Sequence, residues 1–235
     1  MNKNKVNKFL TKYKIRHIGY EELYMEYPDL PNYKDQHGCY YQIPNKHKIK
    51  PILSVIRNPY SRLESLFRFK WWEKYPFIEA GWIRKYCPNF PELSFDEYLH
   101  MTNIITDETK IKYGINSNLK IGDQSIQFIR MFFKKPEEVF LRIDKSYIEN
   151  KLFKNDLCDL TLLRQENLNQ ELIFYLMKHG FNKKEVEFIK NHEKVNVTNF
   201  NDSTSVSRDK IIEYINENEW ILLEILSAFN INYQE

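Results

Sequence analysis

The stretch KPILSVIRNPYSRLESLFRF, residues 50–69, decides how the rest of the chain is interpreted. Ile52 to Ile56 is a short, apolar and mostly β-branched run, which predicts a buried strand. Asn58 and Pro59 then end the strand, because Asn is a good helix N-cap and Pro is favoured at the first helical position. The apolar residues that follow, Leu63, Leu66 and Phe67, have helical spacing. The stretch therefore predicts a strand, a turn and a helix with one face toward a core.

The start of this helix is a candidate anion site. Free backbone amides and the positive end of the helix dipole favour a phosphate there, and Arg57 at the end of the strand can add a charge-assisted contact. Ser65 lies about two helical turns further on, within reach of the same anion if the loop folds back. Many α/β proteins have a strand that leads into such a helix near an arginine. On chemistry alone, an ordinary structural turn is therefore the commoner interpretation.

The complete string is more specific than its parts. Arg57-Asn58-Pro59-Tyr60-x-Arg62-Leu63-x-Ser65-x-Phe67 resembles the signature of sulfotransferases that use 3′-phosphoadenosine-5′-phosphosulfate (PAPS), R-[ND]-P-[YFW]-x-R-L-x-S-x-[YF]. In that family the first arginine and the serine eight residues later hold the 3′-phosphate of the cofactor, and the resemblance gives these roles to Arg57 and Ser65. It implies PAPS as cofactor, 3′-phosphoadenosine-5′-phosphate (PAP) as product, and a hydroxyl acceptor, expected to be a carbohydrate.

A second resemblance lies near the N-terminus, at His17-Ile18-Gly19-Tyr20-Glu21-Glu22-Leu23. It is similar to the family segment H-x-[TSG]-[AY]-x-[ED]-[LF], whose histidine acts in the uronyl 2-O-sulfotransferases as base on the acceptor hydroxyl. The resemblance therefore implies that His17 is the catalytic base. A histidine that caps a helix with two glutamates in its first turn is the structural alternative. His37, in the long connection 28–50, is the second candidate for the base.

The C-terminal third contains two further similarities. The predicted strand 160–163 ends at Arg164-Gln165-Glu166-Asn167-Leu168, which is close to the family's R-x-E-[ND]-L. Lys194-Val195-Asn196-Val197-Thr198 resembles the N-x-S/T loop that sulfotransferases fold over the nucleotide, which implies that Asn196 and Thr198 bind the cofactor. A polar linker ahead of a packing helix is the alternative interpretation of this loop.

Other predicted elements come from caps and periodicity. Ser94 and Glu97 have the spacing of a capping box, and residues 102–122 are expected to form a loop on the acceptor side. A helix begins after Gly122, another ends at Gly180, and the next begins at Asn182. The last predicted element is one long amphipathic helix from Ser207 to about Phe229, with its apolar face made by Ile211, Ile215, Leu222, Leu226 and Phe229.

Composition bounds the class of protein. With 235 residues the chain is expected to form a single domain, residues 1–235. Lys and Arg number 35 against 32 Asp and Glu, and this balance gives no argument for a nucleic-acid partner. The three cysteines lack metal-ligand spacing and are odd in number, so buried free thiols are expected. No apolar run could span a membrane and no signal peptide is evident, which favours a cytoplasmic protein.

The sequence lacks one half of the family signature. Sulfotransferases hold the 5′-phosphosulfate on a loop after their first strand, with a pattern such as K-[TSA]-[GA]-[TG]-T-[ST], and the 235 residues contain no Lys-x-x-Thr-[Ser/Thr]. We therefore expect an N-terminally truncated form of the fold: α/β, with a small, mostly parallel sheet flanked by helices, similar to the P-loop NTPase-like sulfotransferase fold without its first strand and phosphate loop. The expected function is sulfonate transfer from PAPS to a hydroxyl.

Two alternatives to that function stay open. One is a catalytically inactive, sulfotransferase-like module that binds a 3′-phosphoadenosine nucleotide or a partner. The other is a structural or nucleic-acid-binding protein that uses the lysine-rich helix predicted for residues 2–13, in which case binding would depend strongly on salt.

Overall fold

The predicted strand, turn and helix at residues 50–69 are all present. Strand β1 spans Ile52–Ile56, and helix α3 spans Pro59–Phe69 with Asn58 as its N-cap. The computed structural model describes residues 38–74, 80–191 and 206–233. Over these residues the protein is a mostly helical α/β structure with a small two-stranded parallel sheet flanked by helices. The prediction of a parallel sheet flanked by helices is confirmed at this level.

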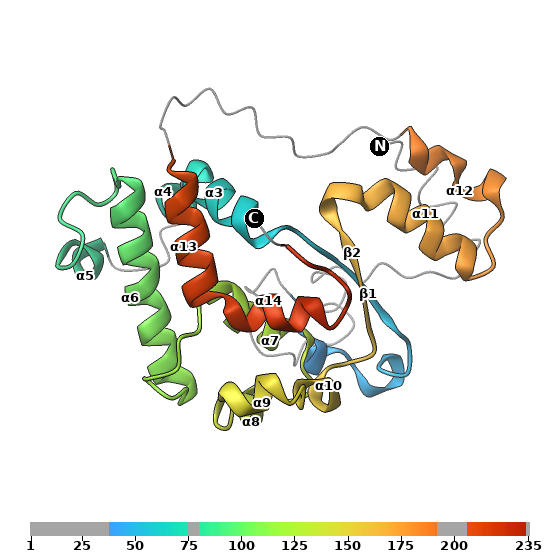
Figure 1. Ribbon diagram of the computed structural model, residues 1–235, viewed down its shortest axis with the longest axis horizontal. Coiled ribbons are helices and arrows are strands. Elements are labelled where there is room, and N and C mark those ends of the chain that lie inside the picture. Colours follow the sequence, from blue (N-terminus) through green and yellow to red (C-terminus); the bar gives the residue numbers. More distant parts are fainter. Residues whose placement is uncertain (1–37, 75–79, 192–205, 234–235) are drawn as a thin grey trace.

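The sheet pairs two strands that are far apart in the sequence. β1 runs parallel to β2 (Leu160–Arg164), in a register from Ile52↔Leu160 to Ile56↔Arg164. Helices α11 (Leu168–Lys178) and α12 (Lys183–Lys190) lie to one side of the sheet, and helices α7 (Asp123–Phe132) and α14 (Trp220–Ser227) lie to the other (Figure 1). The strands therefore separate a helical pair from the larger helical body.

The remaining elements are several short helices and two longer ones, α6 and α13. They are η1 (Tyr40–Gln42), η2 (Asn45–His47), α4 (Trp71–Lys74), α5 (Ala80–Arg84), α6 (Phe95–Tyr113), α8 (Pro136–Phe140), α9 (Lys145–Glu149), α10 (Phe153–Asp156), η3 (Gln165–Asn167) and α13 (Arg208–Asn218). In the described residues, no helix has the length and apolar character needed to cross a membrane.

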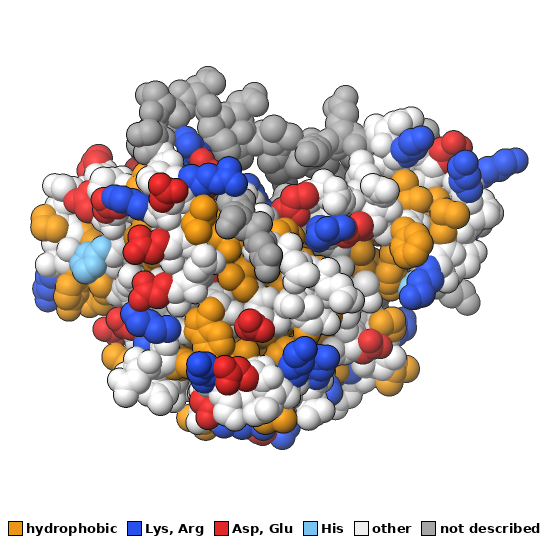
Figure 2. Space-filling view, in the orientation of Figure 1, with side chains coloured by type: hydrophobic (Ala, Val, Ile, Leu, Met, Phe, Trp, Pro, Cys, Tyr) orange, Lys and Arg blue, Asp and Glu red, His pale blue; other side chains and the backbone are white. Residues whose placement is uncertain are grey.

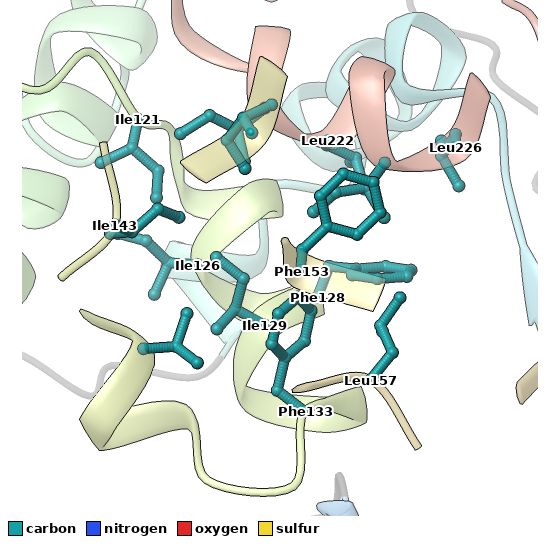
Figure 3. Packing of buried hydrophobic residues seen from close by; sticks show 14 of the residues in the cluster. Ile121, Ile126, Phe128, Ile129, Phe133, Ile143, Phe153, Leu157, Leu222 and Leu226 are labelled. Carbon is teal, nitrogen blue, oxygen red and sulfur yellow. The ribbon is translucent and has the colours of Figure 1, made fainter. Parts of the chain in front are cut away.

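The apolar core has three parts. The largest is centred on α7 and α14 and includes Ile129 and Ile225, which have no exposed surface (Figure 3). The second packs α3, α6 and α13 together around aromatic side chains such as Trp72 and Tyr98, whose rings stack with centroids 5.0 Å apart. The third is small and joins α11 to α12. The helices that border the candidate site, α3, α7 and α11, are thus each fixed by one of these cores.

Several local predictions are confirmed. Ser94 and Glu97 form a capping box at the start of α6, and Asn182 and Glu185 form another at the start of α12. Gly180 has φ +91°, and the amide of Phe181 donates to the carbonyl of Leu176, as in a Schellman motif at the end of α11. The three cysteines, Cys39, Cys87 and Cys158, are buried free thiols.

The predicted loop at residues 102–122 is wrong over its first half. Helix α6 continues through Tyr113 and ends at Gly114, whose φ of +66° suits the left-handed C-cap position. Met101 and Thr106 are buried on its inner side, whereas Ile111 is 75% exposed. An apolar residue in the exposed last turn obscured the helical periodicity, and the C-capping glycine was the signal that marked the true end.

The single C-terminal helix predicted from Ser207 to Phe229 is also wrong, because the chain breaks at Glu219 into α13 and α14. Ile211 and Ile215 pack in the core around α3 and α6, whereas Leu222 and Leu226 pack in the core around α7. The apolar residues that suggested one continuous stripe thus belong to two different cores. Changing direction between α13 and α14 lets one segment serve both.

Glu219 and Ser125 join α7 to α14 by reciprocal capping. The Glu219 carboxylate accepts hydrogen bonds from the amides of Gln124 (2.9 Å) and Ser125 (2.7 Å) in the first turn of α7. It also accepts from the Ser125 hydroxyl (2.6 Å), whose oxygen in turn accepts from the Leu222 amide in α14 (3.3 Å). Each helix therefore satisfies orphan amides of the other.

Candidate phosphate-binding site

The candidate site lies where the two parallel strands end. Ile56 and Arg164 are partners in the register, so Arg57 and the turn after β2 leave the sheet at the same edge. In open α/β sheets, ligands bind outside the carboxyl ends of the strands. The Asn58 amide donates to Glu166 Oε1 (2.8 Å), across 108 residues of sequence. The two segments that resemble the sulfotransferase motifs, around Arg57 and around Arg164, are therefore direct neighbours.

One of the two arginines at the carboxyl ends of the strands is paired with a carboxylate, and the other has no such partner among the described residues. Arg164 is paired with Glu171, to which its side-chain Nε donates (2.5 Å) and its backbone amide also donates (2.6 Å). Arg57 has no carboxylate partner among the described residues, and its Nε donates to the Ser61 hydroxyl (3.2 Å). Arg57 is therefore the cation at this edge that remains available to an anion.

Serine hydroxyls continue from Arg57 along one side of α3. Ser61 and Ser65 are four residues apart in the helix, so they lie on the same face, one turn apart. The Ser61 hydroxyl donates to the Asn58 carbonyl (3.1 Å), and no hydrogen bond is formed by the half-buried Ser65 side chain with any described residue. The arrangement is a row of one guanidinium and two hydroxyls. Such groups can donate to phosphate oxygens.

The expected free amides at the start of α3 are not free, so that part of the prediction is wrong. The Asn58 side chain accepts from the amides of Tyr60 (2.9 Å) and Ser61 (3.4 Å), and the Asn58 carbonyl accepts from the Arg62 amide (2.9 Å). Pro59 has no amide hydrogen. An anion here would consequently be held by the side chains of Arg57 and Ser65, and not by the backbone or by the Ser61 hydroxyl, which already donates to the Asn58 carbonyl.

Arg62 belongs to the same sequence motif as Arg57 and Ser65, but its side chain contacts α7 and not the candidate anion site. It donates to the side chain of Gln127 on α7 (2.5 Å), and Gln127 donates to Asp123 (2.7 Å). Burial raises the pKa of the Asp123 carboxyl, while the charges of Arg62 and Arg130 act in the opposite direction. This chain of contacts fixes α3 against α7 and so fixes the direction in which the Ser61 and Ser65 face points.

Glu219 is a buried titratable residue that the sequence analysis did not single out. Burial raises the pKa of its carboxyl to about 7, although the hydrogen bonds from Ser125 and Gln124 oppose this shift. A glutamate in an otherwise amphipathic helical stretch has no distinguishing local pattern. The one available signal was Gly122, whose Cβ would lie 2.2 Å from Glu219 Oε1, so the close approach requires glycine.

The other predicted site residues lie outside the described residues. This applies to the proposed base His17, to its competitor His37, and to the predicted cofactor ligands Asn196 and Thr198. Their roles stay predictions.

A cleft of about 490 Å³ lies at the opposite end of α3 from Arg57. It is lined by Lys70, Trp72, Glu73, Arg84, Phe90, Pro91 and Glu92. Trp72 is only 2% exposed, and its indole donates to the Pro91 carbonyl (2.9 Å). This tryptophan therefore belongs to the core.

Charged side chains of both signs are interspersed over the visible face of the molecule (Figure 2). Comparisons of the chain with protein-family models, with curated proteins and with solved structures each found no match. The proposal below therefore depends on the residues of the site and on the motifs quoted above.

Proposed function

We propose that this chain is a sulfotransferase-type protein that binds the 3′-phosphate of PAPS through Arg57 and Ser65 and transfers the sulfonate to a hydroxyl acceptor, expected to be a carbohydrate. The observation that carries the proposal is the Arg57 guanidinium, which lies at the end of β1 without a carboxylate partner among the described residues and on the same side of α3 as the Ser65 hydroxyl. A charge-assisted contact to phosphate from such a group is among the stronger polar interactions in proteins.

The arrangement of the two strands supports a more specific proposal for the fold. β1 and β2 run parallel, and each ends in a segment that resembles a sulfotransferase motif. The proposed architecture is a P-loop NTPase-like sulfotransferase fold without its first strand and phosphate loop. The Glu166 contact to the Asn58 amide gives the glutamate of the second motif a specific task, which is to hold the turn that presents Arg57.

The proposed reaction is an in-line displacement at sulfur. The acceptor oxygen forms a bond to sulfur while the bond from sulfur to the bridging phosphate oxygen breaks, and PAP leaves with the electron pair. The acceptor hydroxyl must lose its proton as it attacks, and His17 is the proposed base that takes it. Arg57 and Ser65 hold the far end of the cofactor and do not touch the reacting atoms.

A second candidate function is an inactive module that binds the 3′-phosphoadenosine nucleotide. It is favoured by the described site itself, because Arg57 and Ser65 would hold the 3′-phosphate and neither residue would touch the sulfonate. The two functions share the Arg57 site and differ in turnover. An assay of sulfonate transfer from labelled PAPS to carbohydrate acceptors distinguishes them, with His17→Ala as the variant expected to lose turnover while it keeps nucleotide binding.

Nucleotide binding is tested by calorimetry with PAP and with 5′-AMP, which lacks the 3′-phosphate. The wild type is expected to prefer PAP, and Arg57→Ala should weaken PAP binding by about 1.5–3 kcal/mol, or roughly tenfold to hundredfold, while changing 5′-AMP binding little. Ser65→Ala should weaken PAP binding less.

Arg68→Ala is the matched control, because Arg68 lies at the other end of α3 and pairs with Glu64 (2.9 Å). It should leave the preference for PAP unchanged. Equal affinity of the wild type for PAP and 5′-AMP, or an unchanged preference in Arg57→Ala, would remove the site.

A further inference from the structure

The outer edge of β1 carries backbone groups that have no partner in the part of the chain that the structure describes. The Ile52 amide donates to the Asp159 carbonyl (2.7 Å), which shows that Ile52, and with it Ser54 and Ile56, face β2. Backbone groups of successive strand residues point to opposite edges, so those of Leu53 and Val55 point away from β2. No described residue hydrogen bonds to them. Among the described residues, β1 is thus an edge strand with two donors and two acceptors available.

One face of β1 is also uncovered. The register places the side chains of Leu53 and Val55 on the same face as Thr161 and Leu163. Leu163 is buried and α11 packs against β2, whereas Leu53 is 37% and Val55 46% exposed. Parallel sheets are normally covered on both faces, because their strands are apolar on both sides. The uncovered area therefore adjoins the free edge and has the apolar character of a strand-binding surface.

The charged residues in the segment that contains β1 are all basic. From Gly38 to Arg57 the sequence contains Lys46, Lys48, Lys50 and Arg57 and no Asp or Glu. The present neighbour, β2, has the complementary pattern, because Asp159 precedes it and Glu166 follows it. Antiparallel pairing of β1 with a second copy would bring Lys50 of one chain near Arg57 of the other. Like charges would oppose that pairing, so the favoured occupant is a different strand with acidic flanks.

We propose that the outer edge of β1 binds an extended segment of a partner protein by β-strand addition, and that this segment alternates apolar residues with small polar ones and carries acidic residues at both ends. Backbone hydrogen bonds to Leu53 and Val55 supply the pairing, and the side chains of these two residues contact the apolar side of the added strand. Lys50 and Arg57 select for acidic flanks. The strand-binding edge adjoins the proposed phosphate site and shares Arg57 with it.

The test uses the full chain and two fluorescein-labelled peptides, EEVTVTVEE and its charge-reversed form KKVTVTVKK. Fluorescence anisotropy should show binding of the acidic peptide and at least about tenfold weaker binding of the basic one. Val55→Pro removes an amide that β2 does not use, and should weaken binding of the acidic peptide by at least about tenfold. Val55→Thr is the matched control, since it retains the amide and the β-branched shape.

A measurement on the wild type alone covers the case in which Val55→Pro does not fold. Addition of the acidic peptide should slow hydrogen exchange of the Leu53 and Val55 amides and leave that of the Ser54 amide unchanged. No binding of the acidic peptide, equal binding of both peptides, or unchanged binding by a folded Val55→Pro variant would overturn the proposal. Dimerisation of the wild type that Val55→Pro abolishes would overturn it as well, because the occupant would then be a second copy.

Discussion

The helices α3 and α7 satisfy their first-turn amides in opposite ways. α3 uses its own N-cap, Asn58, whose side chain accepts from the amides of Tyr60 and Ser61 two and three residues later. α7 has Gly122 at the N-cap, which offers no side chain, and depends on the Glu219 carboxylate from 94 to 95 residues further along the chain. The same physical requirement is therefore met once locally and once by tertiary structure.

The difference matters for stability. A local cap forms with its helix and lies near solvent, where its loss typically costs about 1 kcal/mol. The Glu219 cap is 1% exposed and holds α7, α13 and α14 together. Its loss leaves buried amides and a buried hydroxyl without an acceptor, and each such group carries a desolvation penalty. We therefore expect the long-range cap to dominate the stability of the core around α7.

Glu219→Ala should have the largest effect in the molecule outside the apolar cores. It removes the acceptor of three hydrogen bonds and leaves a cavity, and we expect a loss of about 3 kcal/mol or more in the free energy of unfolding. Urea denaturation followed by circular dichroism measures this loss. The matched control is Glu217→Ala, because Glu217 forms an exposed ion pair with Lys120 and should cost less than about 1 kcal/mol. Similar costs for the two variants would contradict the dominant role of the long-range cap.

The pH dependence of stability sharpens this prediction. Burial raises the pKa of Glu219 from 4.5 to about 7, so the folded protein holds the proton more tightly than the unfolded chain. The stabilisation is fully present below about pH 4.5 and is lost as the pH rises through about 7. The stability difference between the wild type and Glu219→Gln, which does not titrate, should accordingly shrink from pH 5 to pH 8. A difference that stays constant over this range would show that the donors keep the carboxyl ionised, because a pKa at or below 4.5 causes no titration between pH 5 and pH 8.

Gly122→Ala should have the next largest effect. Its Cβ would lie 2.2 Å from Glu219 Oε1 and 3.0 Å from the Asn218 carbonyl, so the capping carboxylate would have to move. We expect a loss of about 1–3 kcal/mol. Gly81→Ala is the matched control, because no atom lies within 4 Å of its Cβ position. In the Glu219→Ala background most of the Gly122→Ala cost should disappear, and a double-mutant cycle that gave additive costs would refute the contact.

The sequence predicted the local features of the fold well. The Asn58-Pro59 start of α3, the capping boxes at Ser94 and Asn182, and the Gly180 end of α11 all depend on residues within one or two turns of each other. Such signals are complete in a short window. The break at Glu219 was missed for the opposite reason, since it depends on amides of α7 and on two separate cores that share one segment.

The features of the candidate site also fall into two groups: those that local sequence predicts and those that depend on tertiary structure. The positions of Arg57 and Ser65 at the strand end and on the following helix follow from local sequence. The pairing of Arg164 with Glu171, which leaves Arg57 as the available cation, came only from the structure. The loss of the helix amides to Asn58 could have been foreseen, because the residue predicted to cap the helix consumes the donors that an anion would need.

Substitutions of Asn58 should have the smallest effect on stability, and they test whether the anion site uses side chains or backbone amides. Asn58→Ala should cost about 1 kcal/mol of stability by removing the local cap, with PAP affinity reduced far less than in Arg57→Ala, because the freed amides of Tyr60 and Ser61 become available to an anion. Asn58→Asp keeps an N-cap acceptor and should retain stability in urea denaturation, yet it adds a negative charge next to Arg57 and should weaken PAP binding in calorimetry. The two variants thus separate helix capping from anion binding. If Asn58→Asp bound PAP as tightly as the wild type, Arg57 would not be the group that meets the phosphate, and the local cap would be the whole purpose of this turn.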